Sequence, residues 1–326
     1  KWFLEKGFRE LLDEFSPIED FTGKEFVIEF TDYTLEDPKY DEQHAKVNNL
    51  SYEAPLRVTV QLTNRRTGEI KTQEIFFADF PLMTSHGTFI INGIERVIVS
   101  QLARSFGVYF TADYYRGRKR FGAKVIPNRG VWLEFESDAE GVIWTKIDRK
   151  RKFPVSTLLR VFGLESNEDI LSAFKDIDTG DIKFIETTLK KDATASKDDS
   201  FIEIYKRIRP GEMAALDNAR QLISTMFSDE RYDLSPVGRY KMNLRFKPLG
   251  GGSEKSRILT KQDLLYTIRE IIRKNNTPDE VEDDIDHLGH RRVRAIGEML
   301  QNRLRVGLAR MERNIQDRMS TLDPNT

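Results

Sequence analysis

An acidic segment followed at once by arginines carries the densest chemistry in this sequence. Residues 283–294 read DDIDHLGHRRVR. Carboxylate and imidazole groups can hold a divalent cation, which makes Asp284, Asp286, His287 and His290 a candidate metal site. The arginines that follow would repel a cation, and their planar guanidinium groups suit phosphate or carboxylate partners. An acidic turn that orients arginines through ion pairs is therefore favoured over a metal site.

The residues after this segment predict the element that positions it. Apolar residues recur at steps of three and four, which is typical of one long helix with a buried face. If that helix is continuous, Arg292, Arg303 and Arg310 lie within about 20° of one another, at about 100° per residue. Phosphate contact and structural ion pairing explain this flank equally well. The apolar residues are Val293, Ile296, Leu300, Leu304, Leu308, Met311 and Ile315.

Two further basic stretches carry aromatic residues. Residues 114–121 read YYRGRKRF, and Trp132 precedes the basic run DRKRK at 148–152. Exposed rings can stack on bases while cations follow the phosphate backbone, so both stretches suit single-stranded nucleic acid. A tryptophan at a strand position is more often part of a core. The residues alone leave both readings of Trp132 open.

Length and composition set limits on these sites. A chain of 326 residues favours two domains, because single cores stop growing near roughly 250–300 residues. The 52 basic and 53 acidic side chains leave a net charge of −1, whereas a free-standing nucleic-acid binder is usually basic. The chain has no cysteine, hence no disulfide and no thiolate zinc site, which fits a cytoplasmic location. We expect no membrane span and no signal peptide, and the ends at Lys1 and 322–326 look like cuts in a longer chain.

Periodicity predicts strands in the first part of the chain and helices later. Alternating residues predict strands over 24–33 and 56–62, with a return strand from Ile70 to Phe77. Asn92-Gly93 is a strong hairpin signal, because both positions favour positive φ. Further strands are expected at 124–126, 131–136 and 142–147, and helices from 155 to 245. Gly250–Ser253 is expected to be a flexible joint, and Thr260 with Asp263 marks the start of a helix.

Several segments, in order over nearly the whole chain, resemble the β subunit of bacterial DNA-directed RNA polymerase. They are TFIINGIERVIVSQLARS at 88–105, PNRGVWLEFE at 127–136, IDRKRK at 147–152, YKRIRPGE at 205–212, RYDLSPVGRY at 231–240 and the segment 283–294. The resemblance covers the front part of that subunit, the protrusion and the lobe. It implies an α+β fold of two domains. A discontinuous protrusion of mixed sheet and helix would span 1–110 and 294–326. A mostly helical lobe with a small antiparallel sheet would be inserted at 111–293.

The resemblance also implies three groups of site residues. A pocket for one flipped non-template base, with the nearby strand path, would comprise Arg104, Trp132, Asp148, Arg149, Arg231, Asp286 and Arg291. The edge of the rifamycin pocket would comprise Arg96, Val99, Ser100 and Gln101. An edge strand that docks transcription factors would include Ile70, Lys71 and Thr72. Two residues depart from the family pattern: Phe106 replaces a proline and Thr72 replaces a glutamate.

In such polymerases this part of β walls the DNA cleft, guides the non-template strand and binds regulators. The implied partners are the β′, α and σ subunits, promoter and bubble DNA, and transcription-repair coupling factor or related regulators, with no membrane. The resemblance implies no catalytic residue and no cofactor in this part, because β′ holds the magnesium and the zinc. Two other classes stay open. One is a free-standing metal-dependent nuclease that uses Asp284, Asp286 and His287, and the other is an interaction scaffold with an edge strand at 70–77.

Overall fold

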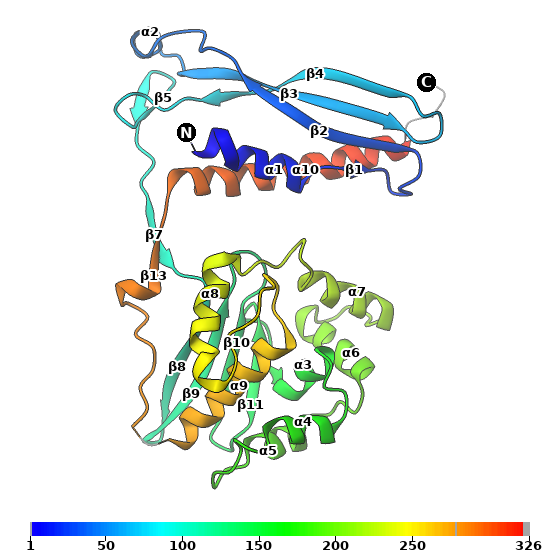
Figure 1. The fold of residues 1–326 in the computed structure, drawn as a ribbon, viewed down its shortest axis with the longest axis vertical. Helices are drawn as coiled ribbons and strands as arrows, with labels where there is room; N and C mark the ends of the chain where they lie inside the picture. Colours follow the sequence, from blue (N-terminus) through cyan, green and yellow to red (C-terminus); the bar gives the residue numbers. More distant parts are fainter. Residues whose placement is uncertain (1, 278, 322–326) are drawn as a thin grey trace. The chain divides into compact units, whose positions relative to one another are not determined.

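The computed structural model describes residues 2–277 and 279–321 (Figure 1). Contacts divide the chain into two compact units: unit 1 comprises Lys1–Ala103 and Val293–Thr326, and unit 2 comprises Arg104–Arg292. Unit 2 is thus inserted into the sequence of unit 1. The boundary expected after residue 110 falls inside strand β8 (Gly107–Tyr115), and the tail at 322–326 lies outside the described residues. Both units combine helices with antiparallel strands, which confirms the predicted α+β class.

Unit 1 is built on a four-stranded antiparallel sheet with α1 (Phe8–Glu14) and α10 (Ile296–Thr321) on one face (Figure 1). The sheet has the order β1 (Ile18–Glu19), β2 (Phe26–Leu35), β3 (Glu53–Asn64), β4 (Ile70–Pro81), and a hairpin of β5 (Phe89–Ile91) and β6 (Ile94–Arg96) follows. The helices are the π-helix η1 (Phe3–Gly7), α1 (Phe8–Glu14), α2 (Glu42–Val47) and α10 (Ile296–Thr321). Phe8 and Leu12 of α1, Val58 of β3 and Leu308 of α10 meet in one apolar core. The two chain segments of unit 1 therefore share a single core.

Unit 2 packs helices around a five-stranded antiparallel sheet. Its order is β12 (Phe153–Pro154), β11 (Ile143–Ile147), β10 (Leu133–Ser137), β9 (Arg118–Ile126), β8. The helices are α3 (Val155–Val161), α4 (Asn167–Phe174), α5 (Phe184–Lys191), α6 (Lys197–Ile208), α7 (Leu216–Met226), α8 (Ser235–Phe246) and α9 (Lys261–Asn276), with the 3-10 turns η2 (Lys247–Leu249) and η3 (Leu288–His290). Phe110, Phe135 and Ile268 are fully or almost fully buried in its core.

Local signals account for several of these elements. The Asn92-Gly93 hairpin is confirmed, with φ of 51° and 76° at the two turn residues. Thr260 begins α9 through a capping box: its hydroxyl accepts from the nitrogen of Asp263, whose carboxylate accepts from the nitrogen of Thr260. Ser166 begins α4 with the same motif. Side chains thus satisfy backbone donors that a helix start leaves without partners.

One expectation about backbone conformation is corrected. The long helix begins at Ile296, because residues just before it form strand β13 (Arg291–Arg294), which pairs with β7 (Gln101–Arg104). Arg292 therefore does not share a helix flank with Arg303 and Arg310. Gly250–Ser253, expected to be a flexible joint, is neither helix nor strand, and Gly250 and Ser253 are exposed. Within it, a Cβ on Gly252 would lie 2.4 Å from the carbonyl oxygen of Asn243 in α8. The close approach of this carbonyl oxygen leaves room only for glycine at position 252.

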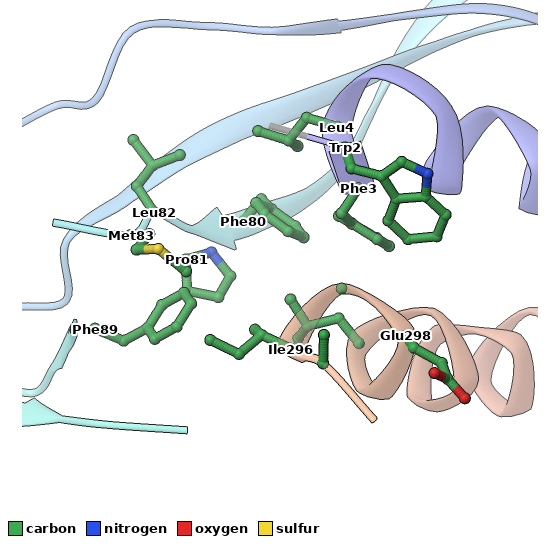
Figure 2. Close-up of a pocket in the computed structure, with 13 residues that line it drawn as sticks. Trp2, Phe3, Leu4, Phe80, Pro81, Leu82, Met83, Phe89, Ile296 and Glu298 are labelled. Atoms are coloured by element: carbon green, nitrogen blue, oxygen red, sulfur yellow. The ribbon is translucent and has the colours of Figure 1, made fainter. Parts of the chain in front are cut away.

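Unit 1 also carries an apolar hollow of about 380 Å³ (Figure 2). Phe3 and Phe80 stack in its wall with ring centroids 5.6 Å apart. Phe89 and Ile296 reach it from other elements, as Figure 2 shows. None of the residues predicted to contact DNA or regulators lines this hollow. Among the described residues, no helix is long and apolar enough to cross a membrane.

Candidate nucleic-acid interface

The pairing of β10 with β11 brings Trp132 beside Asp148. Leu133 pairs with Ile147, so the residues just outside that pair face each other across the end of the hairpin. The nitrogen of Trp132 donates to Oδ1 of Asp148 at 2.8 Å, and the nitrogen of Asp148 donates to the carbonyl of Trp132 at 3.0 Å. The Arg149 guanidinium lies 5.8 Å from the centroid of the indole ring. These three residues line an open hollow of about 200 Å³.

The backbone at this hollow adopts an uncommon conformation. Asp148 and Arg149 have φ of 46° and 60°, in the left-handed region that residues other than glycine seldom adopt. Each such residue stores strain on the order of 1 kcal/mol or more unless local bonds offset it. The reciprocal bonds between Trp132 and Asp148 hold the turn, and the nitrogen of Lys150 donates to the carbonyl of Ile147 at 2.9 Å. The turn places the exposed Arg149 guanidinium near the indole ring and the exposed Asp148 carboxylate at the backbone nitrogen of Trp132.

A buried carboxylate supports Arg149 from below. Glu134 of β10 is 7% exposed, and its Oε1 lies 3.7 Å from Nε of Arg149. Its Oε2 lies 3.5 Å from Nζ of Lys124, the residue opposite it on β9. Sequence reasoning missed both Glu134 and Lys124 as parts of this site. The signal available was Glu134 itself, a charged residue between the apolar Leu133 and Phe135 of a strand.

Lys124 also belongs to a second, smaller hollow on unit 2. Arg104, Tyr109, Lys124, Ile285 and His290 all line it. The His290 ring meets the Tyr109 ring edge-on, with centroids 5.4 Å apart, and the Tyr109 hydroxyl donates to the carbonyl of Ser105 at 2.8 Å. Burial raises the pKa of Tyr109, so this phenol stays neutral and keeps its donor. Arg104 is thereby brought next to the acidic segment, although the two are far apart in sequence.

The carboxylates of the acidic segment have two different environments: Asp283 is bonded to the rest of unit 2, and Asp286 is exposed. Asp283 accepts from the nitrogen of Phe110 at 2.7 Å and from Nη2 of Arg245 at 2.5 Å, which fixes the segment against β8. Asp286 is exposed and forms an ion pair with Arg291. This pair fits the reading of an acidic turn that orients arginines.

The nuclease alternative gains no support from this geometry. Within 2–277 and 279–321, no group of three histidine, aspartate or glutamate side chains converges as metal ligands would. Asp284, Asp286 and His287 thus do not form a shared site. The Nδ1 of His287 instead accepts from the nitrogen of Gly289 at 3.0 Å.

Arg231 belongs to a loop that packs against the residues leading into Trp132. The nitrogen atoms of Asn128 and Arg129 donate to the carbonyl of Asp233 at 2.8 and 3.0 Å. Gly130 has φ of 112°, and a Cβ there would lie 3.1 Å from the carbonyl oxygen of Arg231. The side chain of Arg231 is exposed. Arg231 therefore adds an exposed cation near the start of β10.

The remaining predicted site residues lie in unit 1. Arg96, Val99, Ser100 and Gln101 are exposed, with Val99 at 75%. Ile70, Lys71 and Thr72 are exposed on β4, which is the terminal strand of its sheet. This edge also presents Phe76, which is 54% exposed. The roles of these residues stay predictions.

Phe106, one of the two departures from the family pattern, is buried in unit 2. Its ring lies 4.3 Å below the Arg292 guanidinium. A Cβ on Gly238 of α8 would lie 2.9 Å from the Cβ of Phe106. The phenylalanine thus fills a place between α8 and Arg292, a packing role that a smaller proline ring would fill less completely.

Comparison with known proteins agrees with the resemblance read from the sequence. The family described as RNA polymerase Rpb2, domain 2, matches residues 104–294. The DNA-directed RNA polymerase subunit beta of Syntrophomonas wolfei subsp. wolfei is 48% identical over 328 aligned residues, which cover 100% of this chain. The chain spans 29% of the length of that curated relative. The match extends over unit 2 in the first comparison and over both units in the second, and the chain belongs to the family of bacterial RNA polymerase β subunits.

Proposed function

We propose that this chain forms part of one wall of the DNA cleft of a DNA-directed RNA polymerase and holds one unstacked base of the non-template strand. Family membership supports the polymerase assignment. The observation that carries the base-binding proposal is the convergence of Trp132, Asp148 and Arg149 on one hollow. An indole face, a carboxylate and a guanidinium are the groups needed to stack on a base and read its edge.

The hydrogen-bond inventory favours guanine as the bound base. Oδ1 of Asp148 is engaged by the nitrogen of Trp132, while Oδ2 makes no hydrogen bond within the part of the chain that the structure describes. A free carboxylate oxygen can accept from the N1–H and N2–H groups of an unpaired guanine. Arg149 can donate to the acceptors O6 and N7. Adenine lacks the N1–H and N2–H donors and the O6 acceptor, so it cannot make the same contacts with Asp148 and Arg149.

Exposed cations supply the path for the backbone of the same strand. Arg104, Arg231 and Arg291 all belong to unit 2, and the first two are exposed. Arg291 is paired with Asp286, so a phosphate would have to compete with that carboxylate. Phosphate contacts fix position without reading sequence, whereas the Trp132 hollow supplies the sequence preference. The Arg96 to Gln101 segment is proposed as the edge of a rifamycin pocket.

In this proposal the chain contributes no catalytic residue and no metal ligand to nucleotidyl transfer. The β′ subunit and the rest of β would supply that chemistry, and α and σ would complete the assembly. The exposed edge of β4 would bind transcription-repair coupling factor or related regulators by strand addition, because an unpaired edge offers free backbone donors and acceptors. Thr72 in place of the family's glutamate would change the side-chain part of that contact.

The experiment is a binding titration of the 326-residue chain with two fluorescent oligonucleotides. Both are thymine tracts, and one carries a single central guanine. We expect tighter binding of the guanine-containing strand, and loss of that preference in Trp132→Ala and Asp148→Asn. Trp144→Phe is the matched control, because Trp144 lies on β11 with its Nε1 bonded to Asp138, outside the hollow. Equal affinity of the unmodified chain for both strands would refute the base pocket.

A further inference from the structure

Another concave surface on unit 2 combines cationic and polar side chains, as a ligand site would. The β8–β9 hairpin forms one wall, and the other wall consists of residues 180–182 and the end of α9. The cavity has about 530 Å³, within the roughly 300–1,000 Å³ usual for small-molecule sites. It shares no lining residue with the Trp132 hollow. It is therefore a separate feature of the unit.

The hairpin wall is cationic. Arg116, Arg118, Lys119 and Arg120 all line the cavity. Lys119 forms an ion pair with Glu282, and Arg120 forms one with Asp113 at 2.7 Å. Arg116 and Arg118 are exposed at the hairpin tip, and neither has a carboxylate partner among the described residues. Two guanidinium groups are thus available to an anion.

The tip holds these arginines in a fixed turn. Tyr115 pairs with Arg118, so Arg116 and Gly117 form a two-residue loop with φ of 48° and 77°. This is the conformation of a tight hairpin turn, in which an arginine is an unusual choice at the first position. The guanidinium groups of Arg116 and Arg120 lie 5.2 and 4.9 Å from the Tyr115 ring centroid. These cation–π contacts limit the rotamers of both arginines.

The opposite wall is polar and firmly packed. Asn275 joins α9 to β9: its Oδ1 accepts from the nitrogen of Phe121 at 3.0 Å, and its Nδ2 donates to the carbonyl of Ile271 at 2.8 Å. A Cβ on Gly180 would lie 2.4 Å from Oδ1 of Asn276, so the loop and the helix end are in contact. Asn276 and Asp181 are exposed and line the cavity.

The charges that line the cavity favour a nucleotide over an acidic peptide as its ligand. An acidic peptide would be repelled by the carboxylates of Asp181 on the second wall and of Asp138, which also lines the cavity from the turn between β10 and β11. A ligand with phosphates at one end and hydroxyl or amino donors at the other satisfies both walls. We propose that this cavity binds a nucleotide, with its phosphates on Arg116 and Arg118 and its sugar or base at Asp181 and Asn276. The source is either a free nucleotide or a unit of a nucleic-acid strand.

Fluorescence anisotropy on the 326-residue chain tests this site with two probes. One is a labelled thymine oligonucleotide of about twelve nucleotides, and the other is a fluorescent thymidine diphosphate, which lacks the guanine that the Trp132 hollow is proposed to prefer. We expect the double variant Arg116→Ala/Arg118→Ala to bind at least one of the two probes with an affinity about tenfold lower. Weaker oligonucleotide binding, with a salt slope reduced by about 1.4 for two phosphate contacts, identifies a strand. Weaker diphosphate binding identifies a free nucleotide.

The controls separate this site from general charge and from the base pocket. Lys175→Ala/Lys190→Ala removes two exposed cations of unit 2 that have no ion pair in the described residues, and it should leave both affinities unchanged. Asp181→Asn should weaken nucleotide binding, whereas it would strengthen binding of an acidic peptide. Trp132→Ala should leave diphosphate affinity unaltered. Unchanged affinity for both probes in the double arginine variant, or tighter binding of a glutamate-rich peptide than of either probe, would overturn the proposal.

Discussion

Trp132 and Asp148 exchange two hydrogen bonds, from the nitrogen of each residue to an oxygen of the other, at 2.8 and 3.0 Å. The pair closes the open end of the β10–β11 hairpin and holds two residues with positive φ. The carboxylate that would contact a base therefore also shapes the turn that presents the indole.

This dual role predicts different outcomes for two substitutions at Asp148. Asp148→Ala removes the acceptor for the nitrogen of Trp132 and should lower the free energy of unfolding by about 1 kcal/mol. Asp148→Asn keeps an amide oxygen as acceptor and should preserve stability while it abolishes the preference for guanine. Urea denaturation and oligonucleotide titration measure the two effects. Equal stability of both variants would show that the side-chain bond does not hold the turn.

Removing one partner of the buried ion pair of Arg239 and Asp263 should strongly destabilise unit 2. Nη1 and Nη2 of Arg239 donate to the two carboxylate oxygens of Asp263 at 2.6 and 2.9 Å, and the side chains are 6% and 1% exposed. Asp263→Ala would leave the guanidinium buried without its partner, at a cost of about 3–5 kcal/mol. It would also remove the capping box of α9. Denaturant unfolding measures the loss.

An exposed pair provides the comparison. Arg220 and Asp198 form an ion pair at 2.6 Å with side chains 48% and 47% exposed. Asp198→Ala should change stability by less than about 1 kcal/mol, because water solvates both groups once they separate. If the two aspartate variants were equally stable, burial would not govern these pairs.

Glu280 should make the stability of unit 2 depend on acid pH. The ammonium of Lys274 at 2.7 Å, and then the guanidinium of Arg273 at 2.6 Å, lower the pKa of Glu280 from its ordinary 4.5. A carboxyl whose folded pKa is lowered stabilises the fold fully above the unfolded pKa. That contribution is lost as the pH falls through the folded pKa.

The test compares Glu280→Gln with the parent chain at about pH 7 and about pH 3. The variant should be less stable at the higher pH, and the difference should shrink at the lower pH. Glu230→Gln is the control, since Glu230 is exposed and has no ion pair in the described residues. A stability difference independent of pH would contradict a charge-based role for Glu280.

Neighbouring phenylalanines on β4 should respond oppositely to substitution. Phe76 is 54% exposed, whereas Phe77 packs on Phe8 with ring centroids 5.9 Å apart. Phe76→Lys should leave the free energy of unfolding within about 0.5 kcal/mol and reduce self-association through the open edge, as measured by sedimentation velocity. Phe77→Ala should destabilise unit 1 by roughly 2 kcal/mol or more. Unchanged self-association of the lysine variant would show that the edge of β4 does not mediate association between chains.

Signals contained in a few adjacent residues predicted structure well. Asn92-Gly93 and the Thr260 capping box needed only their own side chains and backbone, and both are confirmed. Strand β8 was missed, because its first half is buried on both faces and shows no alternation. Val293 continued the helical period, yet pairing of β13 with β7 placed it in a strand. Such long-range pairing is invisible to local periodicity.

The candidate site shows the same contrast between what the sequence predicts and what depends on long-range strand pairing. Trp132, Asp148 and Arg149 were named by resemblance, and the structure brings them to one hollow. Glu134 and Lys124 could not be named, since their meeting depends on the register of β10 against β9. The contact between Glu134 and Arg149 depends on how β9, β10 and β11 pair, and the sequence of no single strand predicts it.

The insertion of unit 2 has an evolutionary consequence. The nitrogen of Ser105 donates to the carbonyl of His290 at 2.9 Å, so residues close to the two ends of this unit, Arg104–Arg292, lie side by side. A module with adjacent ends can be lengthened, shortened or exchanged as a cassette while the host domain keeps its own core. Loss or gain of whole helices between α3 and α9 would then leave the entry and exit points unaltered.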